Sequence, residues 1–216
     1  MKKIDFDIRK AEVSDVDDLY NILHENWSSA HFTSFFNEKQ MKKYLTCMVK
    51  MNEYGFVISE KEDFQNKVVG FIIAGINTDR ALNQYLRNNF IYVFFIMIKH
   101  PKFLFEKIYF LLRSLLNIDK QPKTADVSGY LLAKYKITKV KWVAEKLYNH
   151  LEKEISKDGY KSHCFSVRKE NPDVINFLKR ESLNGSKRKI EVIVDNYDKS
   201  KLLLEKKELK AEKNRL

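Results

Sequence analysis

The sequence predicts a single mixed α/β domain. Segments in which apolar residues alternate, which predict strands, are interspersed with segments of helical periodicity along the 216 residues. Only 6 glycines and 3 prolines occur, so irregular structure should be scarce. Hydrophobic residues at 44% and charged residues at 32% are typical of a globular chain. We expect one layered domain at residues 1–197 and a charged helical tail at 198–216.

The first elements are predicted from local patterns. Ile4, Phe6 and Ile8 alternate with charged residues and predict a strand. Ser14 is the expected N-cap of the next helix, with Asp17 three residues on as an approximate capping box. A second helix is expected from Asn37, followed by an antiparallel pair of strands at 56–59 and 68–74 around a polar turn at 60–66.

Residues 80–117 differ in composition from the rest of the chain. They are rich in Phe, Leu, Ile and Tyr with Lys and Arg interspersed, and they predict two helices broken near Pro101. We interpret 80–118 as a helical insertion. A lid over a substrate pocket, a helix lying on a membrane surface through residues 90–116, and a partner surface all explain this pattern, and we favour the lid. The apolar run at 90–98 is too short to cross a bilayer, which needs about 20 residues.

The second half alternates strands and helices again. The clearest helix in the chain is predicted at 139–157, where Val143, Leu147, Leu151 and Ile155 recur at helical spacing before Gly159. The other predicted elements are strands at 127–135, 162–167 and 190–194, a short helix at 171–180 and a charged, helix-prone tail from residue 199.

Charge and cysteine content restrict the class of protein. The net charge of +11 attracts nucleic acid, an anionic membrane or phosphorylated small molecules. No basic and aromatic motif of a known nucleic-acid reader is present, so no specific nucleic-acid partner is expected. Residues 1–9 carry charges throughout and lack the apolar core of a signal peptide, which predicts a cytoplasmic protein.

The sequence contains no pattern that predicts a metal or disulfide site. Cys47 and Cys164 are far apart in the sequence, and His24 and His31 have no matched acidic or thiol partners. His163 and Cys164 are adjacent on a predicted strand and therefore point to opposite faces, so we expect Cys164 to lie in the core.

The order of elements and three segments resemble the GCN5-related N-acetyltransferase (GNAT) superfamily. "IRKAEVSDVDDLYNIL" resembles its opening strand and helix, and "KVVGFIIAG" resembles its central strands. "HCFSVRKENPDVINFLKRESL" resembles its closing segment, in which a strand leads to an Asn, here Asn171, and a short helix. The insertion resembles a bacterial subgroup associated with surface-polysaccharide or sugar-nucleotide pathways. The resemblance extends to about residue 195 and implies a mostly antiparallel central sheet flanked by helices, with an inserted helical pair.

The resemblance also implies a cofactor loop at the start of the long helix. In the family, a cationic residue and small residues place backbone N–H groups around the pyrophosphate of coenzyme A. The best match is "KVKWVA", residues 139–144, in which Trp142 stands where the family has glycine and Val140 is β-branched. The implied co-substrate is acetyl-coenzyme A. The residues implied to bind it are Leu132, Lys134, Lys139, Val140, Lys141, Trp142, Val143, Ala144 and Asn171.

Catalytic groups are less well defined by the sequence. The strand near 131–134 is implied to pair with the pantetheine arm and to polarise the thioester carbonyl through an N–H. Many family members place a Tyr in the closing short helix, where this chain has Leu178. Asp126 is a candidate general base by position only. Trp142 has an alternative interpretation as a core anchor.

Two functions follow from the resemblance. The first is an acyl-coenzyme A-dependent N-acyltransferase acting on a small-molecule amine, in particular an amino sugar or sugar nucleotide. The second is a catalytically inactive protein of the same fold that binds a ligand or partner. Val140, Trp142 and Leu178 motivate the second. The sequence does not define the oligomeric state.

Overall fold

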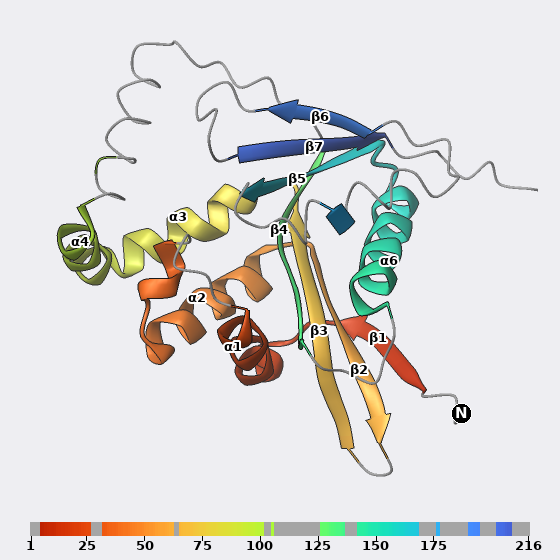
Figure 1. The fold of residues 1–216 in the computed structure, drawn as a ribbon, viewed down its shortest axis with the longest axis horizontal. Helices are drawn as coiled ribbons and strands as arrows, with labels where there is room; N and C mark the ends of the chain where they lie inside the picture. The colour runs from red at the N-terminus through yellow and green to blue at the C-terminus, as the bar shows by residue number, and fades with distance from the viewer. Residues whose placement is uncertain are drawn as a thin grey trace, which may run out of the picture.

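The computed structural model describes residues 5–26, 32–62, 65–101, 105, 126–136, 142–168, 176–177, 190–194 and 202–208. The described strands form one sheet in the order β1-β2-β3-β4-β5-β7-β6 (Figure 1). Neighbouring strands are antiparallel except β4 and β5, which are parallel. The strands are β1 (Phe6–Lys10), β2 (Tyr54–Glu62), β3 (Gln65–Gly75), β4 (Val127–Lys134), β5 (Ser162–Arg168), β6 (Ile190–Val194) and β7 (Leu202–Glu208). The predicted fold class is confirmed.

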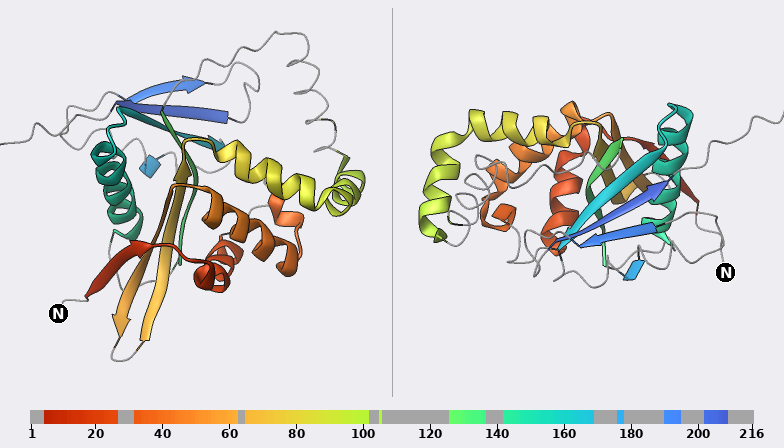
Figure 2. Two further views of the ribbon diagram at one scale, coloured as in Figure 1. Left: turned by 180° about the vertical axis from the view of Figure 1, so that it is seen from behind. Right: turned by 90° about the horizontal axis from the view of Figure 1, so that it is seen from above.

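Helices cover both faces of the sheet. One face carries α1 (Val16–Glu25), α2 (Glu38–Met51) and α3 (Thr78–Asn88), whereas α6 (Val143–Lys157) covers the other (Figures 1 and 2). α4 (Phe90–Lys99) lies at the end of α3 that is farthest from the sheet. Two short 3-10 helices, η1 (Val13–Asp15) and η2 (Phe32–Phe35), precede α1 and α2. Among the described helices, none is both long and apolar enough to cross a membrane.

Two apolar cores result, one on each face of the sheet. Leu19 of α1, Leu45 of α2 and Phe71 of β3 are fully buried in the first. Leu147 and Leu151 of α6 pack with Ile72 of β3 in the second. Burying a side chain of this size stabilises the fold by roughly 1.5–3 kcal/mol. The helical stripe predicted for residues 143–155 is therefore the face that α6 buries.

The start of α1 differs from the prediction. The N-cap of α1 is Asp15 and not Ser14, because η1, whose own N-cap is Glu12, precedes α1. The Glu12 N–H donates to the Asp15 carboxylate at 2.8 Å. Arg9 donates to both oxygens of Asp15, at 2.6 and 2.8 Å. Burial alone would raise the pKa of Asp15, but the hydrogen bonds from Arg9 and Glu12 outweigh it and lower this pKa below its ordinary value. The capping box predicted with Asp17 is wrong.

The central segments are longer or more divided than predicted. α2 begins after Asn37 as expected, and the Asn37 side chain caps it by accepting from Gln40 N at 3.0 Å. β2 and β3 extend into the predicted polar turn and leave 63–64 between them. Residues 78–99 form two helices that meet at Asn89, and α4 ends one residue before His100. The helix predicted after Pro101 lies almost wholly outside the described residues.

The C-terminal tail is the largest correction. The predicted charged helix from residue 199 is wrong, because Leu202–Glu208 forms β7. β7 is antiparallel to β5, with Val167 opposite Leu203, and it also pairs with β6. The strand at Ile190–Val194 is confirmed. Pairing with two strands satisfies the β7 backbone and outweighs the helix propensity of this Leu-, Glu- and Lys-rich segment, because propensity is a small contribution compared with tertiary pairing.

Candidate active site

Strands β4 and β5 separate from each other part-way along their length. They pair only through Val127–Gly129 and His163–Phe165. Beyond this point β4 continues beside β3, and β5 continues beside β7. In the β3–β4 ladder Ile73 faces Leu131 and Ala74 faces Gly129, so Tyr130 is an extra residue in β4. Such a bulge bends a strand, which explains why β4 leaves β5 here.

The separation leaves one backbone edge of β4 open. The N–H of Tyr135 donates to the carbonyl of Val69 on β3 at 3.0 Å. Because the direction of backbone groups alternates along a strand, the N–H and C=O groups of Leu132 and Lys134 point away from β3. Asn26, at the end of α1, donates to the Lys134 carbonyl at 2.7 Å. Within the described part of the chain, no strand pairs with this edge at Leu132.

The N-terminus of α6 lies against β3, beside the last residues of β4. A Cβ atom placed on Gly70 would lie 2.5 Å from Cγ1 of Val143 and 3.2 Å from the carbonyl oxygen of Ala133. Val143 is the first residue of α6 and is 1% exposed. Only glycine at residue 70 lets the helix start approach the sheet this closely. The open edge of β4 therefore ends next to the start of α6.

Trp142 precedes α6 in a backbone conformation that glycine favours. Its φ is 61° and its ψ is 35°, and among the described non-glycine residues it is the one with positive φ. Its side chain is 60% exposed, so its interpretation as a core anchor is wrong. The carbonyl of Trp142 accepts the first hydrogen bond of the helix, from Lys146 N at 2.9 Å. The backbone at this position keeps a glycine-like form although the residue is tryptophan.

The first turn of α6 has no side-chain cap. Side chains cap two of the other described helices: Asn37 accepts from Gln40 N in α2, and Asn77 accepts from Arg80 N in α3. The N-cap residues of α1 and α4, Asp15 and Asn89, make no such bond. An indole has no acceptor with which to cap a helix. The first turn of α6 thus combines the positive end of the helix dipole with N–H donors that the Trp142 side chain does not cap, a combination that suits an anion.

The overall fold resembles that of several solved structures, among them an N-acetyltransferase. SsHAT matches with a TM-score of 0.63 and 10% identity, over 95% of this chain and 98% of that one. Ard1 from Thermoplasma volcanium matches with a TM-score of 0.53 and 16% identity, over 95% and 98%. The PaiA N-acetyltransferase from Thermoplasma acidophilum, solved in complex with coenzyme A, matches with a TM-score of 0.53 and 14% identity, over 94% and 99%.

The chain has the GNAT fold. No protein-family model matches the sequence, and no curated protein matches it. At sequence identities of 10–16% the structural similarity establishes the fold alone. Any reaction has to be argued from the residues of this chain.

The residues that the resemblance implies for coenzyme binding lie only partly within the described part of the chain. Val143 and Ala144 lie in the first turn of α6, Val143 buried and Ala144 half-buried. Leu132 and Lys134 are half-buried on β4, and the Lys134 ammonium donates to the Tyr135 carbonyl at 3.2 Å. Four further predicted positions lie outside the described residues: Lys139, Val140, Lys141 and Asn171. Leu178 of the closing helix also lies outside them.

Asp126 lies at the paired end of β4, beyond the residue at which β4 leaves β5. Its Oδ2 atom accepts from Lys161 N at 2.9 Å, from Ser162 N at 3.1 Å and from Ser162 Oγ at 3.2 Å. The Asp126 N–H donates in turn to Ser162 Oγ at 3.1 Å. These bonds fix the start of β5 beside the start of β4. The Asp126 carboxylate therefore holds β4 to β5. It lies several residues along the chain from the open edge at Leu132.

A buried polar cluster that the sequence did not predict joins α6 to β5. Tyr148, Glu152 and His163 are at most 3% exposed. The Tyr148 hydroxyl and His163 Nε2 are 2.9 Å apart and hydrogen-bonded, and Nε2 lies 3.8 Å from Oε1 of Glu152. Tyr148 and Glu152 are four residues apart, directly after the apolar Leu147 and Leu151, and this spacing was the available signal. Cys164 on the opposite strand face is buried, as predicted.

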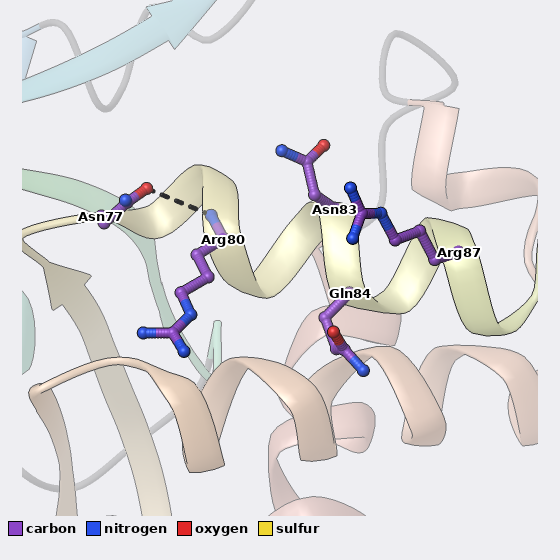
Figure 3. Close-up of a pocket in the computed structure, with 5 residues that line it drawn as sticks. All are labelled: Asn77, Arg80, Asn83, Gln84 and Arg87. Atoms are coloured by element: carbon purple, nitrogen blue, oxygen red, sulfur yellow. Dashed lines mark hydrogen bonds between the residues drawn. The ribbon is translucent and has the colours of Figure 1, made fainter.

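A groove of about 420 Å³ lies along α3, on the opposite face of the sheet from α6 (Figures 1 and 3). Its lining is polar: Asn77, Arg80, Asn83, Gln84 and Arg87. The guanidinium groups of Arg80 and Arg87 point in different directions (Figure 3). Two diverging cations do not define a pocket for one small anion, so we place the candidate active site at the open edge of β4.

Proposed function

We propose that this chain is an acyltransferase that moves an acyl group from acyl-coenzyme A to the amine of a small molecule. The observation that carries the proposal is the open edge of β4, which ends beside the N-terminus of α6, where the Trp142 side chain caps no N–H group. An extended amide-containing arm can pair with a strand edge. A pyrophosphate suits the N–H groups of a helix start. One ligand with both parts, coenzyme A, fits the two neighbouring features.

Each described residue has a defined part in this proposal. Leu132 would pair its outward N–H and C=O with the amide groups of the pantetheine arm. The N–H groups at Val143 and Ala144 would bind the pyrophosphate, together with the cationic side chains of Lys139 and Lys141, which precede α6 in the sequence. Lys134 would contribute positive charge at the end of the strand. Acetyl-coenzyme A is the proposed co-substrate.

The reaction needs little covalent chemistry from the protein. The amine nitrogen attacks the acyl carbon, a C–N bond forms, the C–S bond breaks, and the departing sulfur takes a proton. The proton lost by the amine passes to a base or to water. An outward N–H on β4 would stabilise the developing oxyanion. Holding the amine and the thioester together supplies most of the remaining acceleration.

An amino sugar or an amino sugar nucleotide is the proposed class of acceptor. The insertion at 80–118 resembles that of enzymes in such pathways, and the net charge of +11 favours a phosphate-bearing acceptor. A cationic surface raises the local concentration of an anionic substrate, and this effect weakens as salt screens the charges.

Calorimetric titration of the full chain with acetyl-coenzyme A tests the cofactor part of the proposal. Desulfo-coenzyme A, which lacks the thioester, is the comparison ligand. Saturable binding of both is the expected result. Acceptor-dependent release of free thiol, measured first with amino sugar nucleotides, then tests the reaction. Absence of binding at millimolar ligand would sink the proposal.

One observation favours a second function, that of a non-catalytic binding protein with the same fold. Trp142 places an indole at the helix start where the GNAT loop has glycine, and Glu145 puts a negative charge in the first turn of α6. Both oppose a bound pyrophosphate. Trp142→Gly distinguishes the two functions when coenzyme binding is measured beside the Lys153→Gly control on the same helix. The non-catalytic function predicts that Trp142→Gly leaves the absence of coenzyme binding unchanged.

A further inference from the structure

Helix α4 exposes a continuous apolar face. Its outward side chains are 46–71% exposed and recur at positions i, i+1, i+4, i+5 and i+8, the spacing of one helical stripe. They are Phe90, Ile91, Phe94, Phe95 and Ile98. The rings of Phe90 and Phe94 stack at 5.9 Å between centroids. A helix that is apolar on all sides is ordinarily buried, and exposed apolar stripes of this kind mark interaction sites.

The opposite side of α4 holds the helix to the body of the protein. Val93 and Ile96 are 3% and 8% exposed. The hydroxyl of Tyr92 accepts a hydrogen bond from Asn37 N, at the start of α2, at 2.9 Å. The outward stripe is therefore held in a fixed orientation. Among the described residues none covers it, whereas a closed lid would bury this face.

The segment of sequence that contains the stripe is basic. Residues 80–117 contain six basic residues and one acidic residue, Glu106, a net charge of +5 out of +11 for the whole chain. Arg87 precedes α4 and is exposed, and Lys99 is the last residue of α4 and is exposed. α4 itself has no acidic residue. Two copies of this face would bring like charges together, which disfavours self-association.

We propose that α4 binds the surface of an anionic membrane. The stripe from Phe90 to Ile98 enters the boundary between headgroups and acyl chains, and Arg87 and Lys99 contact lipid phosphates. A helix of 10 residues is far too short to cross the bilayer, so α4 would lie at the membrane surface. A convex face of aromatic and aliphatic side chains needs no complementary groove in a fluid lipid surface. Basic residues add attraction to anionic lipid.

Flotation of the full chain with lipid vesicles tests the proposal. The vesicles contain phosphatidylcholine alone or phosphatidylcholine with phosphatidylserine. The double variant Ile91→Asn with Phe95→Asn removes two exposed apolar side chains, and Val13→Asn, at a separate exposed position, is its control. Arg87→Gln removes one charge beside α4, and Lys153→Gln on α6 is its control. Light scattering after size exclusion gives the solution mass of each protein.

The expected result is binding to the phosphatidylserine vesicles that weakens as ionic strength rises. The apolar double variant should lose at least about tenfold in partition, and Arg87→Gln about fivefold, with both controls unchanged. Absence of binding to anionic vesicles at low salt overturns the proposal, as does equal binding by the double variant. A dimer in solution that the double variant converts to a monomer also overturns it, in favour of self-association. None of these results depends on coenzyme binding.

Discussion

Replacing Trp142 by glycine and by alanine separates backbone strain from side-chain contact. Both variants lose the indole, and they differ only in the ability of the residue to adopt a φ of 61°. An L-residue in this left-handed region costs about 1–2 kcal/mol, which glycine avoids. At an ordinary helical position the order is reversed, and alanine is more stable than glycine by about 1 kcal/mol.

The expected magnitudes follow from exposure and conformation. Trp142 is 60% exposed, so about 100 Å² of its side-chain surface of up to ~250 Å² is buried. Removing the indole loses this buried area, which costs at most ~2.5 kcal/mol of stability. Both variants share this loss, and it cancels in their comparison. Glycine relieves backbone strain of about 1–2 kcal/mol, but its greater loss of conformational entropy on folding costs about 0.5–1 kcal/mol. Trp142→Gly should therefore be more stable than Trp142→Ala by about 0.5–1 kcal/mol.

Urea unfolding followed by circular dichroism measures the difference. With a slope of about 2–3 kcal/mol/M, the midpoint of the glycine variant should exceed that of the alanine variant by about 0.3 M. Lys153→Ala and Lys153→Gly, at an exposed position inside α6, are the matched pair and should show the opposite order. An alanine variant at residue 142 that equals or exceeds the glycine variant would refute the strained helix start.

Three further changes test other parts of the structure. Gly70→Ala should displace the start of α6, destabilise the protein by about 1–3 kcal/mol and weaken coenzyme binding; Gly55→Ala, whose added Cβ would lie 3.5 Å from its nearest neighbour, should be tolerated in the same denaturation assay. Because the folded-state pKa of Asp15 is lowered, its stabilisation is present above the unfolded value near 4 and is lost as pH falls through the folded value. Asp15→Asn should therefore flatten the acid limb of a stability–pH curve, and an unchanged limb contradicts the assigned ion pair. Tyr148→Phe removes the hydrogen bond to the buried His163 and should cost about 1–3 kcal/mol in urea unfolding; a neutral result would show that the bond contributes little.

Elements with a complete local signal were predicted well. Helix α2 begins after Asn37, whose side chain caps it, and its apolar residues follow one face. The strand at Ile190–Val194 and the stripe of α6 were likewise visible in the sequence. In each case the deciding interactions lie within a few residues, so periodicity and capping chemistry suffice.

Elements decided by distant partners were not predicted. The tail at Leu202–Glu208 is a strand because β5 and β6 lie beside it, a contact that no local pattern in a lysine-rich segment reveals. The break between α3 and α4 at Asn89 was also missed, since the whole of 80–99 is helix-prone. Local propensity is weak compared with the free energy of pairing and burial, and the tertiary environment outweighs it.

For the candidate site, too, some features were predicted from the sequence and others were decided by the tertiary structure. The sequence by itself determined the order of the strands as far as Val194, the long helix at its place in the chain, and Leu132 and Lys134 as positions on the strand before it. Only the tertiary structure decided that a bulge at Tyr130 opens the edge of β4. It also decided that Gly70 admits the start of α6 beside that edge and that Trp142 keeps a glycine-like backbone. The physical reason is that direction, distance and backbone strain arise between segments far apart in the chain, whereas a sequence pattern reports only neighbours.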